Sequence, residues 1–324
     1  MIRVVGANPA MDRVSTWAPV QMGEVNRALE VSVVPGGKGF NAARAVVRLG
    51  AGATAYGFLG GHVGEALREL IAADGVEDRH TTIAAGTRVC FIVVEPDAGR
   101  STVLNEPGPA VTSAEAARFL DDLRADCGPG DIVLLSGSLP DSVDPAVAGE
   151  VITIGNEAGA RTITDIHSEA LRIAAGRQPW MVKCNRDELL GLLGDGTPDA
   201  AALVRYQALP LPHLGADMQR LHERGIEVVI VTLGGDGALI AAADGVSHVT
   251  VPHVDVVNAT GSGDLLLAGL SVGIERDLPL QDALVLGAAC GTAGATELKP
   301  ELPPGFDPDA WTPRIGVAAV ERGA

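Results

Sequence analysis

A glycine-rich turn followed by a carboxylate stands near the C-terminal end of this 324-residue chain. Gly261, Ser262 and Gly263 precede Asp264, and apolar residues follow at helical spacing. The backbone N–H groups of such a turn converge on one point, and the start of a helix adds positive potential there. We therefore expect the turn to bind an anion such as a transferring phosphoryl group, with Asp264 placed to accept a proton from a hydroxyl group. A carboxylate that only begins a helix would have the same spacing, so both interpretations stay open at this point.

A second glycine cluster, PGGKGFN at residues 35–41, precedes a helical pattern. Glycine lets the backbone approach a ligand closely, and Lys38 and Asn41 add polar groups at the same place. The cluster is not a P-loop, because that motif would need glycine where Ser32 stands and Ser or Thr at position 39, which is glycine. By itself the cluster fits a plain loop-to-helix turn equally well.

The elements that must position these groups alternate along the chain. Short runs that are apolar on both faces predict buried strands at residues 2–6, 131–135, 161–165, 179–183 and 227–233. Helical spacing of apolar residues predicts helices at 39–49, 63–74, 112–124, 145–158, 217–224 and 280–297. This alternation predicts an α/β fold with a mostly parallel central sheet covered by helices on both faces.

Three segments depart from the alternation. Residues 12–34 and 87–105 are strand-like without long helices between their strands, so we expect them to form a small separate β-sheet that acts as a lid. Residues 193–216 predict an inserted surface loop with about one helical turn. We expect the whole chain, residues 1–324, to form a single domain.

The composition argues against several classes of function. The formal net charge is −17 at pH 7, and a surface this acidic repels nucleic acid and anionic membranes. No stretch reaches the ~18 apolar residues that a membrane-spanning helix requires. The four cysteines form no CxxC pair and have no histidine at metal-ligand spacing, which is typical of reduced, buried thiols. We expect a cytoplasmic protein that binds neither nucleic acid nor a membrane.

Together, the two glycine segments resemble the two signature regions of the PfkB-type carbohydrate kinases, the ribokinase-like family. Further motifs resemble the family in the same order: Asn8-Pro9 through Asp12, Thr87-Arg88, NEPGP at 105–109, SGSLP at 136–140, KCNRDE at 183–188 and VTLGGDGA at 231–238. The resemblance covers residues 2–297. It implies a ribokinase-like three-layer α/β/α sandwich and the transfer of the γ-phosphoryl group of ATP to a sugar hydroxyl, with Mg²⁺ as cofactor.

The resemblance also implies a role for each matching residue. Asp264 is the catalytic base, and the amides of Gly261, Ser262 and Gly263 hold the transferring phosphoryl group. Asn185 and Glu188 organise Mg²⁺ through water, and a helix at 286–297 forms a wall of the adenine pocket. The nucleotide-binding set consists of Lys183, Asn185, Thr232, Gly234 and Gly237. The sugar-binding set consists of Asp12, Gly36, Gly37, Lys38, Asn41, Arg88 and Ser138.

The hexose-phosphate branch of the family is the most similar, because of Lys38, Arg88 and NEPGP. Arg88 could bind a phosphate bidentately and Lys38 could act as a point charge, with Arg27 as a weaker third candidate. Fructose 1-phosphate, giving fructose 1,6-bisphosphate, is the substrate that the motifs favour. Fructose 6-phosphate, tagatose 6-phosphate, an unphosphorylated sugar or nucleoside, and a non-catalytic sugar-binding regulator remain open. The resemblance further implies a homodimer formed lid to lid.

Three positions depart from the family pattern. Asn258 stands where many members have an aspartate that helps to bind a monovalent cation, although asparagine does occur there in the hexose-phosphate branch. Val89-Cys90 follows Arg88 where Thr-Asn is frequent, and Leu265 follows the catalytic aspartate where a small residue is common. These changes bear on the cation and on the identity of the sugar more than on the reaction.

Overall fold

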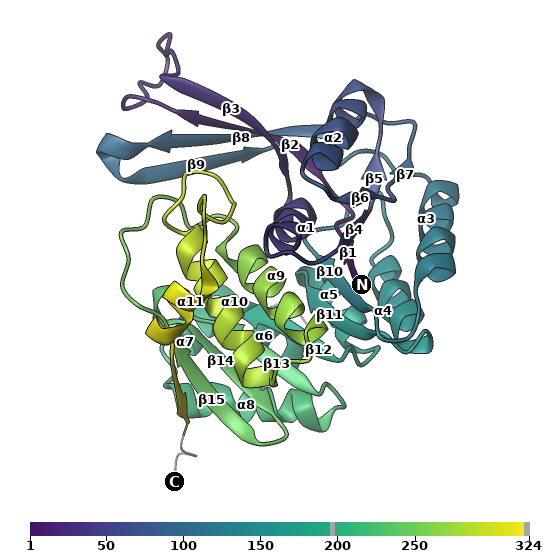
Figure 1. Ribbon diagram of the computed structural model, residues 1–324, viewed down its shortest axis with the longest axis vertical. Helices are drawn as coiled ribbons and strands as arrows, with labels where there is room; N and C mark the ends of the chain where they lie inside the picture. Colours follow the sequence, from purple (N-terminus) through teal and green to yellow (C-terminus); the bar gives the residue numbers. More distant parts are fainter. Residues whose placement is uncertain (195–197, 321–324) are drawn as a thin grey trace.

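The computed structural model describes residues 1–194 and 198–320 (Figure 1). Its main sheet has ten strands, of which the first seven in chain order run parallel and the last three antiparallel. In spatial order the strands are β16 (Gly316–Ala319), β15 (Gly245–Thr250), β14 (Ala238–Ala242), β13 (Val228–Thr232), β12 (Met181–Asn185), β11 (Arg161–Asp165), β10 (Ile132–Ser136), β1 (Ile2–Val5), β4 (Ala53–Tyr56) and β6 (Glu77–Asp78). The mostly parallel sheet and its five predicted buried strands are confirmed.

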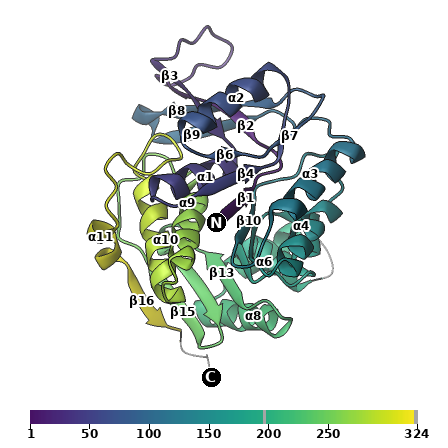
Figure 2. The ribbon, with the colours of Figure 1, turned by 45° about the vertical axis from the view of Figure 1, so that its right-hand side comes forward.

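Helices cover both faces of this sheet and complete the three layers (Figures 1 and 2). One face packs against α1 (Lys38–Arg48), α2 (Gly61–Ala73), α9 (Ser262–Glu275) and α10 (Leu280–Gly294). The other face packs against α3 (Ser113–Asp126), α4 (Ala146–Glu157), α5 (Ser168–Ala175), α6 (Arg186–Leu193) and α8 (Leu211–Glu223). Shorter elements are α7 (Ala200–Gln207), α11 (Pro308–Trp311), the strand pair β5 (Phe58–Leu59) and β7 (Thr81–Thr82), and 3-10 helices at Pro96–Ala98, Gly234–Asp236 and Thr312–Arg314.

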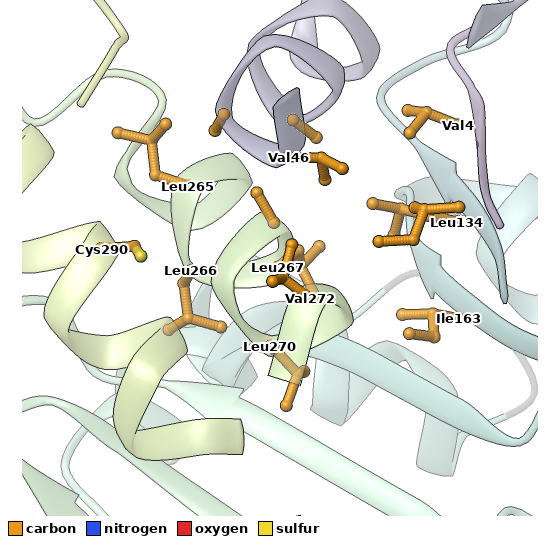
Figure 3. Packing of buried hydrophobic residues seen from close by; sticks show 14 of the residues in the cluster. Val4, Val46, Leu134, Ile163, Leu265, Leu266, Leu267, Leu270, Val272 and Cys290 are labelled. Carbon is orange, nitrogen blue, oxygen red and sulfur yellow. The ribbon is translucent and has the colours of Figure 1, made fainter. Parts of the chain in front are cut away.

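The strand sequences explain why there are two hydrophobic cores. Ile2 and Val4 of β1 point into the core under α1, α9 and α10, whereas Val5 points into the core under α3 and α4. This alternation is the normal consequence of the two-residue period of a strand. Figure 3 shows the first core, where Leu267 and Leu270 of α9 lie between α10 and the sheet. Helix α9 is therefore fixed at the centre of the domain, and so is the glycine turn that precedes it.

The small sheet expected from residues 12–34 and 87–105 is confirmed. Its strands, in spatial order, are β3 (Glu30–Gly36), β2 (Ala10–Thr16), β8 (Arg88–Glu95) and β9 (Arg100–Asn105). One face buries Val14, Val34, Ile92 and Val94 as a separate hydrophobic cluster. Figures 1 and 2 show this sheet projecting from the main domain beside α1, and its inner face contributes to the cavity described below.

The prediction of a loop at residues 193–216 is wrong for most of the segment, which is helical. The helix α7 occupies Ala200–Gln207, and α8 begins at Leu211, six residues before the predicted helix. The Asp199 side chain caps α7 by accepting a hydrogen bond from the Ala202 amide, and α8 buries Leu214. Residues 195–197 lie outside the described residues, and the idea that the segment is an insertion stays a prediction. Among the described residues, none of the helices has the length and apolar character needed to cross a membrane.

Candidate active site

A cavity of ≈ 760 Å³ lies between the carboxyl ends of the main strands and the inner face of the small sheet. Its walls include most of the residues that the sequence singled out: Asp12, Gly37, Lys38, Asn41, Arg88, Ser138, Lys183, Thr232, Gly234, Gly237, Gly261, Ser262, Gly263 and Asp264. Gly36, Asn185 and Glu188 are not among the lining residues. The fold thus brings the two glycine segments, more than 200 residues apart in the chain, to one place.

The glycine turn leads directly into a helix, as the sequence predicts. Helix α9 begins at Ser262, and its N-cap Gly261 has φ 86°, a left-handed conformation that favours glycine. Asp264 lies in the first helical turn and is only 4% exposed. Its Oδ2 accepts a hydrogen bond of 2.9 Å from Nδ2 of Asn41 in α1. The amides at the start of α9 and one buried carboxylate therefore face the same cavity.

The surroundings of Asp264 raise its pKa into the neutral range. Burial raises the pKa of Asp264 to about 7, and the negative charge of Asp165 adds to the effect. The charges of Lys38 and Lys183 and the hydrogen bond from Asn41 oppose this rise. A carboxylate with such a pKa is partly ionised at pH 7 and can both accept and release a proton.

Asp165 is a component of the site that the sequence reasoning missed. It ends β11 and is 1% exposed. Its Oδ1 accepts a 3.0 Å hydrogen bond from Nζ of Lys183, and both carboxylate oxygens lie 3.3 Å from Nζ of Lys38. Burial opposes ionisation, but the two lysines hold the pKa of Asp165 below its usual value. The available signal was an aspartate at the carboxyl end of a predicted buried parallel strand, which is where ligands of such sheets bind.

Residues that the sequence predicted to bind the sugar, Asp12 and the second glycine cluster, form one part of the cavity wall. A Cβ on Gly36 would lie 2.0 Å from Cγ of Asp12, so glycine is required for the carboxyl group to stay in its place. Gly37 has φ 90°, another conformation that favours glycine. Burial raises the pKa of Asp12 to about 6, although the charge of Arg88 opposes the rise.

Arg88 is held by the backbone through two of its three nitrogen atoms. Its Nη1 donates to the Glu106 carbonyl at 3.1 Å and its Nη2 to the Asn8 carbonyl at 2.9 Å. Its buried Nε has no hydrogen-bond partner among the described residues. Asn8, which the sequence reasoning placed in a motif but not in the site, donates from Nδ2 to Oγ of Ser138 at 3.1 Å. This corner of the cavity holds the polar groups that an anionic substituent would need.

Residues that the sequence predicted to bind the nucleotide form another part of the cavity wall. Thr232 ends β13, and the tight turn after it contains Gly234 at φ 63° and Gly237 at φ 87°. A Cβ on Gly237 would lie 1.9 Å from the carbonyl oxygen of Val249, so the turn accepts no larger residue without moving. The opposite wall comes from α10 and its C-terminal end, with Ala288, Gly291, Thr292 and Ala295, in the region that the sequence predicted as the adenine wall.

Asn185 and Glu188 form a capping box at the start of α6. Oδ1 of Asn185 accepts from the Glu188 amide at 2.9 Å, and Oε2 of Glu188 accepts from the Asn185 amide at 2.8 Å. Burial lowers the pKa of Lys183, but the charge and hydrogen bond of Asp165, with smaller effects of the charges of Asp264 and Glu188, raise it overall. The described residues contain no group of three or more His, Cys, Asp or Glu arranged to bind a metal directly. The water-mediated Mg²⁺ role of this pair stays a prediction.

The structure also gives the positions of Asn258 and Arg27, which the sequence singled out. Asn258 is 3% exposed, donates to the Leu298 carbonyl at 2.9 Å and accepts from the Thr260 amide at 3.0 Å. Its amide therefore joins two loops next to the α9 turn by hydrogen bonds that a carboxylate could make only in part. Arg27 is exposed in the loop between β2 and β3 and does not line the cavity.

Comparisons with known proteins agree with this geometry. Residues 7–301 match the pfkB family carbohydrate kinase model. The chain is 32% identical to 1-phosphofructokinase of Bacillus subtilis (strain 168) over 91% of this chain and 92% of that one. It is 31% identical to 1-phosphofructokinase of Escherichia coli (strain K12) over 93% and 95% of the two chains.

Solved structures show the same similarity. Phosphofructokinase-2 from Escherichia coli in complex with potassium matches with a TM-score of 0.86 at 25% identity, over 96% of this chain and 98% of that one. The same Escherichia coli protein has also been solved in complex with fructose-6-phosphate and in a tetrameric inhibited form.

Proposed function

The chain belongs to the pfkB family of carbohydrate kinases, and from this premise we propose that it transfers the γ-phosphoryl group of ATP to fructose 1-phosphate, giving fructose 1,6-bisphosphate. The observation that carries the proposal is the position of Asp264. It is a buried carboxylate with a pKa of about 7, at the first turn of α9, in a cavity large enough for both substrates. A protein that only bound sugars would have no use for a base beside an anion-binding turn.

In the proposed reaction Asp264 accepts the proton of the sugar hydroxyl as its oxygen attacks the γ-phosphorus. The bond from that phosphorus to the bridging oxygen of ADP breaks as the new bond forms. The amides of Gly261 and Gly263 donate to the phosphoryl oxygens as negative charge moves, whereas the Ser262 amide, which the sequence also placed in this role, already donates to the Ala259 carbonyl at 3.2 Å. Asn41 keeps the Asp264 carboxylate aimed at the sugar. Mg²⁺ supplies charge neutralisation of the phosphates when bound, and Asn185 and Glu188 would hold it through water.

The substrate's own phosphate is assigned to the corner between the small sheet and the main domain. Arg88 is held by two backbone carbonyls at the cavity wall, so its guanidinium group needs little further ordering to meet a phosphate. Asn8, Ser138 and Lys38 lie in the same cavity wall. The relatives named 1-phosphofructokinase favour fructose 1-phosphate, while fructose 6-phosphate and tagatose 6-phosphate carry the same charge and are the alternatives.

An ADP-release assay with Mg-ATP across phosphorylated and free sugars tests the substrate. Replacement of Arg88 by alanine should lower kcat/KM for the hexose phosphate by about one to two orders of magnitude, because a charge-assisted contact contributes ~1.5–3 kcal/mol. R88K should recover only part of the loss, and the KM for ATP should change little. R205A is the matched control, since Arg205 is an exposed arginine on α7, away from the small sheet, and does not line the cavity. A wild-type preference for a free sugar or nucleoside over every hexose phosphate would refute the proposal.

We further propose that a second copy of the chain covers the outer face of the small sheet. The strand register places Val33, Arg13, Phe91 and Leu104 in one row on that face, and the three apolar residues of the row are 41%, 39% and 55% exposed. Val31 on the same face is 55% exposed. An apolar sheet face of this kind is normally covered in solution.

The oligomeric state tests the homodimer directly. Light scattering of the purified protein at micromolar concentration should give the mass of a dimer. The double substitution V33E/F91E should give a monomer, because it places two charges in the centre of the proposed interface. A wild-type monomer, or a dimer that tolerates V33E/F91E, would contradict an interface at this face.

A further inference from the structure

We propose that Asp165 is a positioning residue for phosphoryl transfer, because it joins the lysine on the sugar side of the cavity, Lys38, to the lysine on the nucleotide side, Lys183. The inference rests on the kinase function proposed above. It concerns how the two halves of the site are held in register, and nothing in the sequence motifs assigns this residue a role.

The geometry places Asp165 between elements that approach it from different directions. Lys38 is the first residue of α1, directly after the glycine turn, and Lys183 is the middle residue of the neighbouring strand β12. Both ammonium groups reach the same carboxylate, at 3.0 Å for Lys183 and 3.3 Å for Lys38. The Asp165 carboxylate is therefore the shared anchor of two cations that belong to separate parts of the chain.

Each lysine needs such an anchor. A lysine side chain is a flexible stem with ~2 kcal/mol of rotamer entropy, so without a partner its ammonium group is poorly placed for a phosphate. Two ammonium groups held near one point also repel each other unless a negative charge lies between them. Together the two lysines and Asp165 carry a net charge of +1, which remains available to the phosphates in the cavity.

The anchor acts directly on the reacting centre. A Cβ added to Gly263 would lie 2.9 Å from Nζ of Lys183, so this ammonium group lies against the anion-binding turn. Lys38 acts on the base, since its charge lowers the pKa of Asp264 against the larger effect of burial. Loss of Asp165 would therefore loosen the cation at the turn and the cation beside the base at once.

The charged groups that face Asp264 predict the sign of a measurable effect. They are Asp165 at the end of β11, Lys38 on α1 and Lys183 on β12, together with the neutral donor Asn41. Removing the negative charge of Asp165 takes away one group that raises the pKa of Asp264. It also leaves both lysines uncompensated, and they lower that pKa. Both consequences lower the pKa of Asp264. The acid limb of the pH profile, where kcat/KM falls because Asp264 becomes protonated, should therefore move to lower pH.

The test is the Asp165→Asn variant, which keeps the shape of the side chain and removes the charge. We expect KM to rise about tenfold or more for both ATP and the sugar, since both lysines lose their partner. We expect the acid limb of kcat/KM to move down by about one pH unit or more, the usual effect of a nearby charge. The reaction is run with whichever sugar the wild-type enzyme phosphorylates best, so the outcome does not depend on the identity of the substrate.

Asp131→Asn provides the matched control. Asp131 is also a buried carboxylate, 8% exposed, and it pairs with Arg3 at 2.7 Å just before β10, at the other end of the main strands. This variant should lose thermal stability and leave the acid limb where it is. An Asp165→Asn enzyme that behaves in the same way, with lower stability but unmoved pH profile and KM values, would overturn the positioning role.

A second variant keeps the inference testable if Asp165→Asn does not fold. Lys38→Met removes one of the two cations and leaves the Asp165 carboxylate less compensated, so the acid limb should move to higher pH, opposite to the first variant. An unmoved limb in Lys38→Met would also overturn the inference. If the wild-type enzyme phosphorylates no sugar at all, the proposed function fails, and that result is separate from either shift.

Discussion

Replacement of Asn41 by alanine should move the acid limb of activity to higher pH. The Asn41 amide donates a 2.9 Å hydrogen bond to Oδ2 of Asp264, and the asparagine is only 5% exposed. A hydrogen bond donated to a carboxylate stabilises its ionised form and so lowers its pKa. Asp264 already has a pKa raised to about 7 by burial. Loss of the donor should raise that value further.

The size of the shift follows from the strength of the contact. A hydrogen bond to a charged group contributes ~1.5–3 kcal/mol, and 1.36 kcal/mol corresponds to one pKa unit. Water can enter the open cavity and replace part of the interaction, so the lower end, about one unit, is the expectation. The ionised fraction of Asp264 at pH 7 then falls from about one half to about one tenth. Through this effect alone, kcat/KM should fall about fivefold at pH 7 and far less above pH 9.

The measurement is a pH profile of kcat/KM for the sugar at saturating Mg-ATP and constant ionic strength, which reports the pKa of the free enzyme. Asn105→Ala is the control, because Asn105 also lines the cavity but lies on β9 and makes no contact with Asp264 in the described hydrogen bonds. The control can change KM but should not move the acid limb. An Asn41→Ala limb that stays in place or moves to lower pH would refute the electrostatic account of the base.

Three other substitutions test separate parts of the site. Gly36→Ala should raise KM for the sugar more than tenfold, because the new Cβ would overlap the carboxyl group of Asp12, whereas Gly86→Ala, with nothing within 4 Å, should behave like wild type in the same assay. Asp264→Asn should lower kcat by at least ~10²-fold with ATP binding retained. Since burial raises the pKa of Asp264 from its ordinary value of 3.8 to about 7 in the folded state, wild type loses stability as the pH rises between these two values, so the melting-temperature advantage of this variant over wild type should be larger at pH 8 than at pH 5. Asn258→Asp should lower activity and stability, and a titration with KCl should restore part of both, because the substitution replaces a donor with a carboxylate beside a carbonyl group.

The sequence predicted the parts of the fold that depend on short-range patterns. Buried parallel strands are continuous apolar runs, and the helix at 112–124 has a capping box that the structure reproduces at Thr112 and Glu115. The small sheet was predictable because its strands follow one another without helices. Residues 193–216 were mistaken for a loop because their prolines, glycines and aspartates are typical of turns, yet Asp199 and Pro210 stand at helix starts, where the same residue types are favoured.

The residues of the candidate site likewise divide into those that the sequence could identify and those that it could not. The glycine turns could be recognised because their function depends on the backbone, which leaves a local sequence signature. Arg88 could be recognised as a cation but not as one already held by two carbonyls, since the partners Asn8 and Glu106 come from other segments. Asp165 was not identified from the sequence because a single aspartate at the end of a strand is common. Only the structure shows that Lys183 and Lys38 both contact its carboxylate.

The two buried carboxylates of the site have opposite environments, and this difference assigns their roles. Both Asp165 and Asp264 lie at the end of an element, and both are almost completely buried. Asp165 faces two ammonium groups, so its pKa is lowered and it remains ionised as an anchor. Burial raises the pKa of Asp264 to about 7 and the negative charge of Asp165 adds to the rise, against the opposing effects of both lysines and of the Asn41 hydrogen bond, so Asp264 can exchange a proton near neutral pH. Where the pKa values of two acids are pushed apart in this way, the acid with the raised pKa is suited to acid–base catalysis, which supports the role proposed for Asp264. The opposite shifts expected from Asp165→Asn and Asn41→Ala measure the two sides of this arrangement independently.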